Sequence, residues 1–142
     1  MLRPEQLSDP LRALDDANQC ELYSILPGPE PGAPKEEFHG YPVLGKVSIN
    51  DRAARERLTN VLKAGVLAGH GGNCFVPRHA IRTVKGATTT DFVICFECKH
   101  VYIWRNGEPG VGFKVGRTPE PVFDEMLKGA GIPLAPKAVE HR

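Results

Sequence analysis

Four residues in the middle of the chain have the types and the spacing of a metal site. Cys95 and Cys98 are separated by two residues, an interval at which both thiolates of a tight turn can bind one ion. Cys74 and His79, with four residues between them, offer a second pair of ligands. Because structural zinc takes four sulfur or nitrogen ligands, the two pairs together predict a Cys₃His zinc site.

The same cysteines admit three other interpretations, which the sequence leaves open. Cysteine is often buried as a small hydrophobic residue, so these side chains could simply fill the core. Cys95 and Cys98 could form a redox dithiol, or Cys74 could bridge to either of them, although a redox Cys-x-x-Cys motif usually begins a helix. Cys74 could also be a nucleophile with His79 as its base, but no third residue that would orient the histidine stands out.

The paired-thiol interpretations require a turn inside an apolar run. Residues 91–104 read DFVICFECKHVYIW, a stretch that β propensity alone would draw as one strand. Side chains at positions i and i+3 face opposite sides of a flat strand, so both sulfurs can meet only where the chain turns or bulges. The two cysteines therefore predict a break in this strand between Glu97 and His100.

The elements that would position these residues follow from hydrophobic periodicity. Strands are predicted over residues 21–26, 41–50, 81–86, 91–104 and 111–115. The pair Asn106-Gly107 predicts a hairpin between the last two, and residues 86–91 are predicted as a turn region.

Two amphipathic helices are predicted around this run of strands. The first covers residues 51–69, with Asn50 or Asp51 as its N-cap and an apolar face that extends to Leu67. The second covers residues 119–131, with Thr118 as its cap. The order of elements predicts an α+β fold, in which a mainly antiparallel sheet of four to five strands packs against two helices.

One folded domain is expected in a chain of this length. Residues 1–37 are predicted to form an N-terminal arm, in which a short helix starts near Asp9, and a linker rich in proline and glycine. Residues 38–133 would form the α+β domain, and residues 134–142 a tail.

The charge balance limits the classes of partner. Eighteen Lys and Arg residues nearly balance seventeen Asp and Glu residues, so the net charge of +1 gives no overall attraction to nucleic acid or to anionic lipid. Basic residues do lie near aromatic ones in adjacent predicted strands, but strand aromatics mostly belong to the core, and binding of nucleic acid is not expected. No apolar window approaches a membrane span, and we expect a cytoplasmic protein, or an exported one if a leader has been removed.

Three segments resemble a group of short bacterial proteins with CFxPRHxI and ICFxC motifs. The segments are CFVPRHAIR, FVICFEC and RTPEPVFDEMLKGAGIPLAP, and the resemblance covers about residues 20–136. No activity is established for that group, so the resemblance implies no function. Some of its members carry export leaders, which favours a disulfide among the cysteines.

These observations favour a small binding or interaction protein over an enzyme, with another protein as its partner and zinc as its cofactor. The first alternative is a thiol redox protein or a cysteine-dependent enzyme that uses Cys95 with Cys98, or Cys74 with His79. The second is an immunity-type or inhibitor-type protein whose cysteines only fill the core. The oligomeric state does not follow from the sequence.

Overall fold

The computed structural model describes residues 11–15, 17–69 and 75–136. Residues 11–15 form a short helical segment. The other elements, in chain order, are β1 (Gln19–Ile25), β2 (Glu37–Phe38), β3 (Tyr41–Ser48), α2 (Arg52–Ala64), β4 (Val66–Leu67), β5 (His79–Lys85), β6 (Thr88–Cys95), β7 (His100–Arg105), β8 (Glu108–Pro109), β9 (Phe113–Val115) and α3 (Glu120–Gly129).

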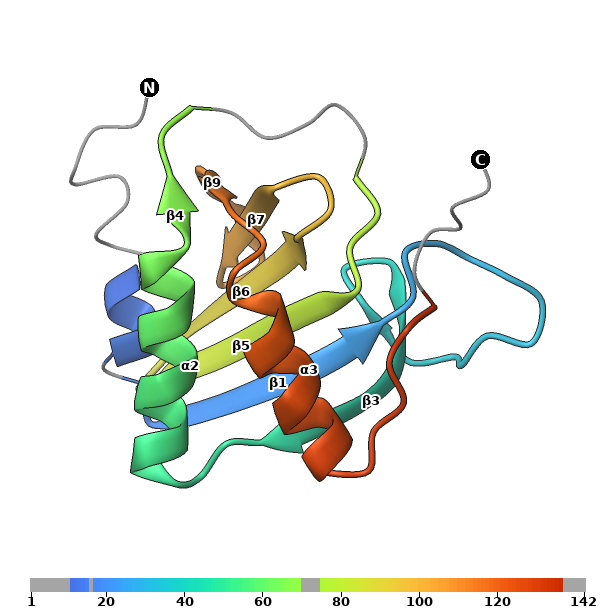
Figure 1. The fold of residues 1–142 in the computed structure, drawn as a ribbon, viewed down its shortest axis with the longest axis horizontal. Helices are drawn as coiled ribbons and strands as arrows, with labels where there is room; N and C mark the ends of the chain where they lie inside the picture. The colour runs from blue at the N-terminus through green and yellow to red at the C-terminus, as the bar shows by residue number, and fades with distance from the viewer. Residues whose placement is uncertain (1–10, 16, 70–74, 137–142) are drawn as a thin grey trace.

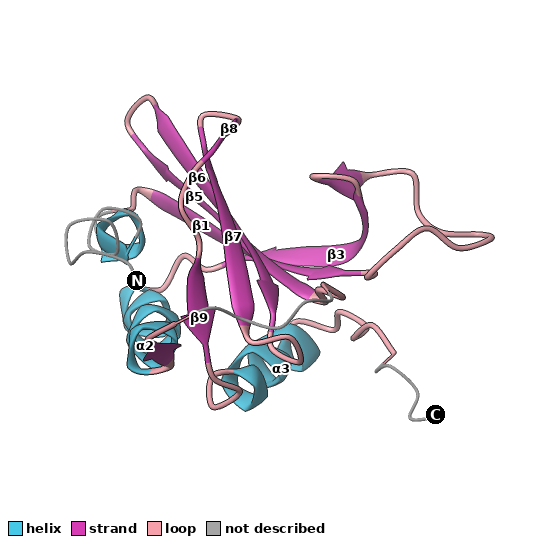
Figure 2. Cartoon of the chain, turned by 90° about the horizontal axis from the view of Figure 1, so that it is seen from above, coloured by secondary structure: helices cyan, strands magenta, loops and turns pink. Residues whose placement is uncertain are grey.

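The strands form one antiparallel sheet, and α2 and α3 lie on the same side of it (Figures 1 and 2). The strand order is β2-β3-β1-β5-β6-β7-β9-β4, with β8 paired to β7. The predicted α+β class is confirmed, but the predicted count of four to five strands is wrong, because the described residues alone contribute nine strands to the sheet. Three of the additional strands, β2, β4 and β8, have two residues each, which is too short for a periodicity to be recognised.

The strand β1 lies in the middle of the sheet, between β3 and β5. The sequence predicts these residues as part of the N-terminal arm, because the proline-rich stretch that follows them is typical of a linker. That stretch is instead a long connection within the sheet, and Leu22 and Ile25 of β1 are fully buried. Residues 19–25 therefore belong to the folded unit.

The helix α2 begins as predicted and ends earlier. Asp51 is the N-cap, and its Oδ2 accepts a hydrogen bond of 2.9 Å from the backbone N–H of Ala54. The helix stops at Gly65, where a Cβ would lie 2.8 Å from the ring of Pro119, and the chain then enters β4. Leu67, which the sequence placed on the apolar helix face, is consequently 44% exposed.

Turn geometry explains two further differences from the predicted elements. The β5–β6 turn needs only Gly86, which has a φ of +59°, and the residue after it, so the threonines predicted as a turn belong to β6. At α3 the N-cap is Pro119, which makes no side-chain capping bond, and not Thr118. The turn at Asn106-Gly107 is confirmed, since both residues have positive φ. It joins β7 to β8, however, and not directly to the predicted strand over residues 111–115, part of which forms β9.

The two sides of the sheet carry separate cores. On the side covered by the helices, called here the helix face, strand residues pack with residues of α2 and α3; they include Leu22, Ile81, Phe92, Ile94, Leu58, Leu62, Phe123 and Leu127. On the opposite side, the far face, the β2–β3 hairpin closes a smaller core that includes Tyr23, Phe38, Ala80 and Val93. Neighbouring residues of one strand thus serve different cores.

No helix in the described residues is long and apolar enough to cross a bilayer.

Candidate functional site

The predicted break in the apolar run is confirmed. Strand β6 ends at Cys95, strand β7 begins at His100, and the four residues between them form a turn. Lys99 takes the left-handed conformation, with a φ of +61°, and its N–H donates to the carbonyl of Phe96. A left-handed residue is uncommon for lysine, and here it lets the chain reverse in this short turn.

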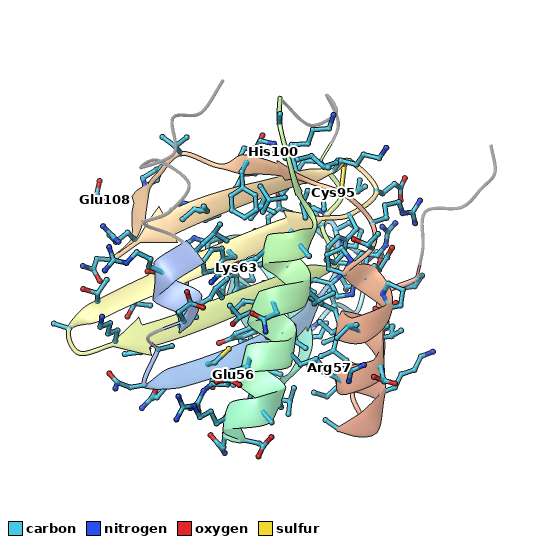
Figure 3. All side chains as sticks on the ribbon, turned by 60° about the vertical axis from the view of Figure 1, so that its left-hand side comes forward. Glu56, Arg57, Lys63, Cys95, His100 and Glu108 are labelled. Atoms are coloured by element: carbon cyan, nitrogen blue, oxygen red, sulfur yellow. A yellow bond between two sulfur atoms is a disulfide. The ribbon has the colours of Figure 1, made fainter. Side chains whose placement is uncertain are left out.

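The turn brings the sulfurs of Cys95 and Cys98 together in a disulfide, whose Cα atoms are 5.2 Å apart. Figure 3 shows this bond beside Cys95, at the same end of the sheet as His100. The backbone N–H of Cys98 also donates to Sγ of Cys95, with a distance of 3.0 Å. Both residues are nearly inaccessible, at 1% and 4% exposure, so the pair is a buried centre.

His79 lies on the helix face, away from the sulfur pair. It is the cross-strand neighbour of Ile94, so it shares the face opposite to that of Cys95, the next residue of β6. Its Nε2 lies 2.7 Å from Oδ1 of Asp124, and its ring contacts those of Phe96 and Phe123. The alternation of side chains along β6 thus separates the predicted histidine ligand from the cysteines.

Two of the four predicted metal ligands are therefore brought together, and His79 is directed to another partner. Cys74 lies outside the described residues. Within the parts of the chain that are described, no group of three or more His, Cys, Asp or Glu side chains is arranged to hold a metal ion. The Cys₃His site stays a prediction.

The segment that precedes β5 is held against the cysteine turn. The backbone N–H of Val76 donates to Sγ of Cys98 at 3.4 Å. The guanidinium of Arg78, which is buried, donates to Oε1 of Glu97 at 3.1 Å and to the carbonyl of Pro136 at 2.7 Å. The turn between β6 and β7 is thus the point at which residues 75–78 and the C-terminal segment, here the residues up to Pro136, come together.

An aromatic cluster lies on the far face beside this meeting point. Phe75 contacts the rings of Tyr102, His100 and Tyr41, with centroid distances of 4.4, 6.4 and 6.4 Å. His100 is the cross-strand neighbour of Cys95, and Tyr102 is 45% exposed. Phe75 therefore packs on His100, the cross-strand neighbour of Cys95, and on the partly exposed Tyr102.

The far face also holds an ionic network that the sequence did not predict. Asp91 is buried, and its two oxygens accept hydrogen bonds of 2.8 and 2.9 Å from Nε and Nη2 of Arg82. Nε2 of His39 lies 2.8 Å from the same carboxylate, and the His39 ring stacks on Trp104 at 4.0 Å. The hydrogen bonds with Asp91 raise the pKa of Arg82 above its ordinary value.

The predicted proximity of basic and aromatic residues divides between the two faces. Phe92 and Phe96 are buried in the core of the helix face, whereas Tyr102 and Trp104 belong to the far face. Arg82, the basic residue nearest to Trp104 in the sheet register, forms an ion pair with Asp91. These residues consequently do not line one common surface.

Cys20, on strand β1, is a free thiol buried in the core on the helix face of the sheet. Burial raises its pKa to about 11, so the thiol stays protonated and unreactive near neutral pH. This excludes Cys20 as a nucleophile and makes it an internal reference for the other cysteines.

Comparisons with protein-family models, with curated proteins and with solved structures returned no match to this chain. The resemblance to short bacterial proteins stays a prediction, and the function is argued from the geometry above.

Proposed function

We propose that the protein is a small binding protein in which Cys95 and Cys98 form a reversible thiol–disulfide centre. One observation carries the proposal: the bonded sulfurs lie where the β6–β7 turn, residues 75–78 and the C-terminal segment meet. A change in the sulfur–sulfur bond would therefore act on three segments at once.

The chemistry is exchange with a low-molecular-weight disulfide, RSSR. A thiolate of the reduced pair attacks one sulfur of RSSR, forms a mixed disulfide and releases RSH. The second cysteine then attacks the protein sulfur of the mixed disulfide, the Cys95–Cys98 bond closes, and a second RSH leaves. The two cysteines lose two electrons and two protons in all, and the external disulfide takes up both.

Reduction must move atoms in a closely packed region. Bonded sulfurs are about 2.05 Å apart, whereas atoms in non-bonded contact need about 3.5–4 Å. Because both cysteines are buried, the extra space has to come from neighbours, and Val76 donates directly to Cys98. Phe75 would move with Val76 and alter the aromatic cluster that it joins.

The aromatic cluster is the surface through which we propose that a partner protein binds. Aromatic rings are enriched in protein interfaces, and Tyr102 is both exposed and in contact with Phe75. The burial of both sulfurs favours a slowly responding binding protein over an oxidoreductase, which needs an accessible thiolate. In a reducing cytoplasm, the expected location, the resting form would be the dithiol.

Disulfide mapping in glutathione buffers of graded potential tests the proposal. Free thiols are alkylated under denaturing conditions after each equilibration, and the peptides are identified by mass spectrometry. We expect Cys95 and Cys98 to gain or lose protection together, while Cys20 is alkylated at every potential. A bridge from Cys74 to either residue, or four alkylated cysteines under the most oxidising conditions, would sink the proposal.

A structural zinc site is the second candidate, and the backbone donors favour it. The N–H groups of Cys98 and Val76 point at the two sulfurs, and such donors stabilise thiolates in metal centres as well as in redox pairs. In this candidate Cys95, Cys98 and Cys74 supply thiolates, and His79 has to exchange Asp124 for the metal. Elemental analysis of protein purified under reducing conditions without added metal decides it, because tight binding predicts about one zinc per chain and less than about 0.2 contradicts it.

A further inference from the structure

A groove of about 450 Å³ opens at the other end of β6 from the cysteines. Its lining comes from the short helical segment of residues 11–15, from the hairpin end of β5 and β6, and from the end of β7. The residues that line it are Arg12, Ala13, Thr83, Lys85, Gly86, Thr88, Thr90 and Arg105. Thr90 is five residues from Cys95, about 17 Å along an extended strand, so the groove is separate from the thiol site.

Three residues from adjacent strands lie side by side in the lining of this groove, two of them buried threonines and one an exposed arginine. Thr90 is the cross-strand neighbour of Thr83 on one side and of Arg105 on the other. The hydroxyl of Thr83 donates to the carbonyl of Thr90, with a distance of 3.3 Å. Strand pairing therefore places Thr90 and Arg105 side by side on one face of the sheet without help from a loop.

Among the described residues, the hydroxyl of Thr90 is the one buried side-chain polar group that lacks a hydrogen-bond partner. Thr90 is 1% exposed, and its Oγ1 is buried without a hydrogen-bond partner among the residues that the structure describes. A buried hydroxyl that makes no hydrogen bond lowers stability, and valine would fit the same space without that cost. A group that accepts a hydrogen bond at this position would remove the penalty.

The charged residues in the described lining of the groove all have the same sign. Arg12, Lys85 and Arg105 carry one positive charge each, and no carboxylate is among the described residues that line the groove. The net charge of the whole chain is only +1, so these cations are a local concentration. Arginine forks and hydroxyl groups are the donors that suit the oxygens of a phosphate group.

We propose that this groove binds the phosphate group of a small molecule, with Thr90 Oγ1 and the Arg105 guanidinium as its donors. This inference is independent of the proposed thiol function, because it uses other residues at the opposite end of the strand.

Titration of the ¹⁵N-labelled full chain with inorganic phosphate tests the site, with chloride at equal ionic strength as the reference. Saturable shifts of the Thr90, Arg105 and Gly86 amides below about 20 mM phosphate are expected. A second titration with glycerol 2-phosphate distinguishes an esterified from a free phosphate as the preferred ligand. Shifts that are linear in phosphate, or that chloride reproduces, would overturn the site.

Two variants and one matched control distinguish phosphate binding in the groove from general electrostatic attraction of phosphate to the protein. Thr90→Val and Arg105→Gln should each weaken phosphate binding at least about tenfold, the loss expected for one strong hydrogen bond. Lys114→Gln removes one charge from β9, outside the groove, and should change the affinity less than about twofold. Thr90→Val should keep or raise the thermal midpoint without ligand, and equal losses of affinity in Lys114→Gln and Arg105→Gln would contradict the proposal.

Discussion

The two ends of strand β6 differ in whether their buried polar atoms have partners within the protein. At the Cys95 end the polar atoms have partners: the sulfurs are bonded and accept from two backbone N–H groups, and buried Arg78 is held by Glu97 and Pro136. At the Thr90 end a buried hydroxyl has no partner in the described part of the chain, and three exposed cations surround the groove.

From this contrast we expect the Cys95 end to stabilise the fold and the Thr90 end to bind a ligand. Removing a buried group whose partners are all in the protein leaves those partners unsatisfied, which costs stability. Removing a group whose hydrogen-bond partner is a ligand costs little stability and weakens ligand binding instead. Substitutions at the two ends should therefore differ in sign as well as in size.

The largest expected effect is the loss of stability in Arg78→Ala, compared with Arg105→Ala at the other end. Arg78→Ala should lower the free energy of unfolding by about 3 kcal/mol, because it removes a charged hydrogen bond to Glu97 and a bond to Pro136 from a buried position. Arg105→Ala, in the exposed rim of the groove, should stay within about 0.5 kcal/mol of the parent. Urea denaturation of both variants measures the difference, and equal losses would remove the contrast between the ends.

Alkaline pH should lower the stability contributed by Cys20, which is the cross-strand neighbour of Thr83 at the Thr90 end of the sheet. Burial raises its pKa from 9.0 to about 11, so the unfolded chain loses this proton first as the pH rises. Stability from this thiol is complete below pH 9 and falls by about 2–3 kcal/mol between pH 9 and pH 11. Cys20→Ala is the control, and its unfolding free energy should fall less over this range than that of the parent.

Opening the disulfide should cost somewhat less. By the chain-entropy model a loop of this length contributes about 2 kcal/mol, so oxidised protein should be more stable than Cys98→Ser by that amount. Under reducing conditions the difference should be smaller. Cys95→Ser and the double variant should match Cys98→Ser, because all three lack the same bond. Parent protein with the same urea midpoint when oxidised and when reduced would argue against a stabilising disulfide.

The smallest effect is expected at the threonines, and here the sign is informative. Thr90→Val should stabilise the protein by up to about 1 kcal/mol, since it removes a buried hydroxyl for which the described residues offer no partner. Thr83→Val removes a hydroxyl that donates to Thr90 O and should destabilise by about the same amount. Thermal unfolding of the two variants compares neighbouring side chains of the same type; destabilisation by both would mean that Thr90 has a partner within the protein.

Local rules predicted the parts of the site that depend on neighbouring residues. The break between Glu97 and His100 followed from the two cysteines, because strand geometry does not allow both sulfurs to meet without it. The Asp51 cap and the Asn106-Gly107 hairpin followed from the same kind of reasoning. The α+β class followed from the order of these elements.

Long-range pairing decided what the sequence could not predict. The register of β5 against β6 places His79 opposite Ile94 and so on the helix face, and a shift by one residue would have reversed this. The Asp91 network depends on His39, fifty-two residues away, which a positive φ in the β2–β3 turn brings over Trp104. That the Thr90 hydroxyl lacks a partner among the described residues depends on packing alone, since nothing in a run of three threonines distinguishes the last one.

The backbone amide of Val76 tests the central claim most directly, because it donates to Cys98 and leads to the aromatic cluster through Phe75. Amide spectra of the oxidised and the reduced protein should differ at residues 75–78 and 95–100, and should coincide at Thr83 and Thr90 at the other end of the sheet. Reoxidation should restore the first spectrum. A Val76 amide that is unchanged by reduction, in protein whose thiol count has risen by two, would contradict the account.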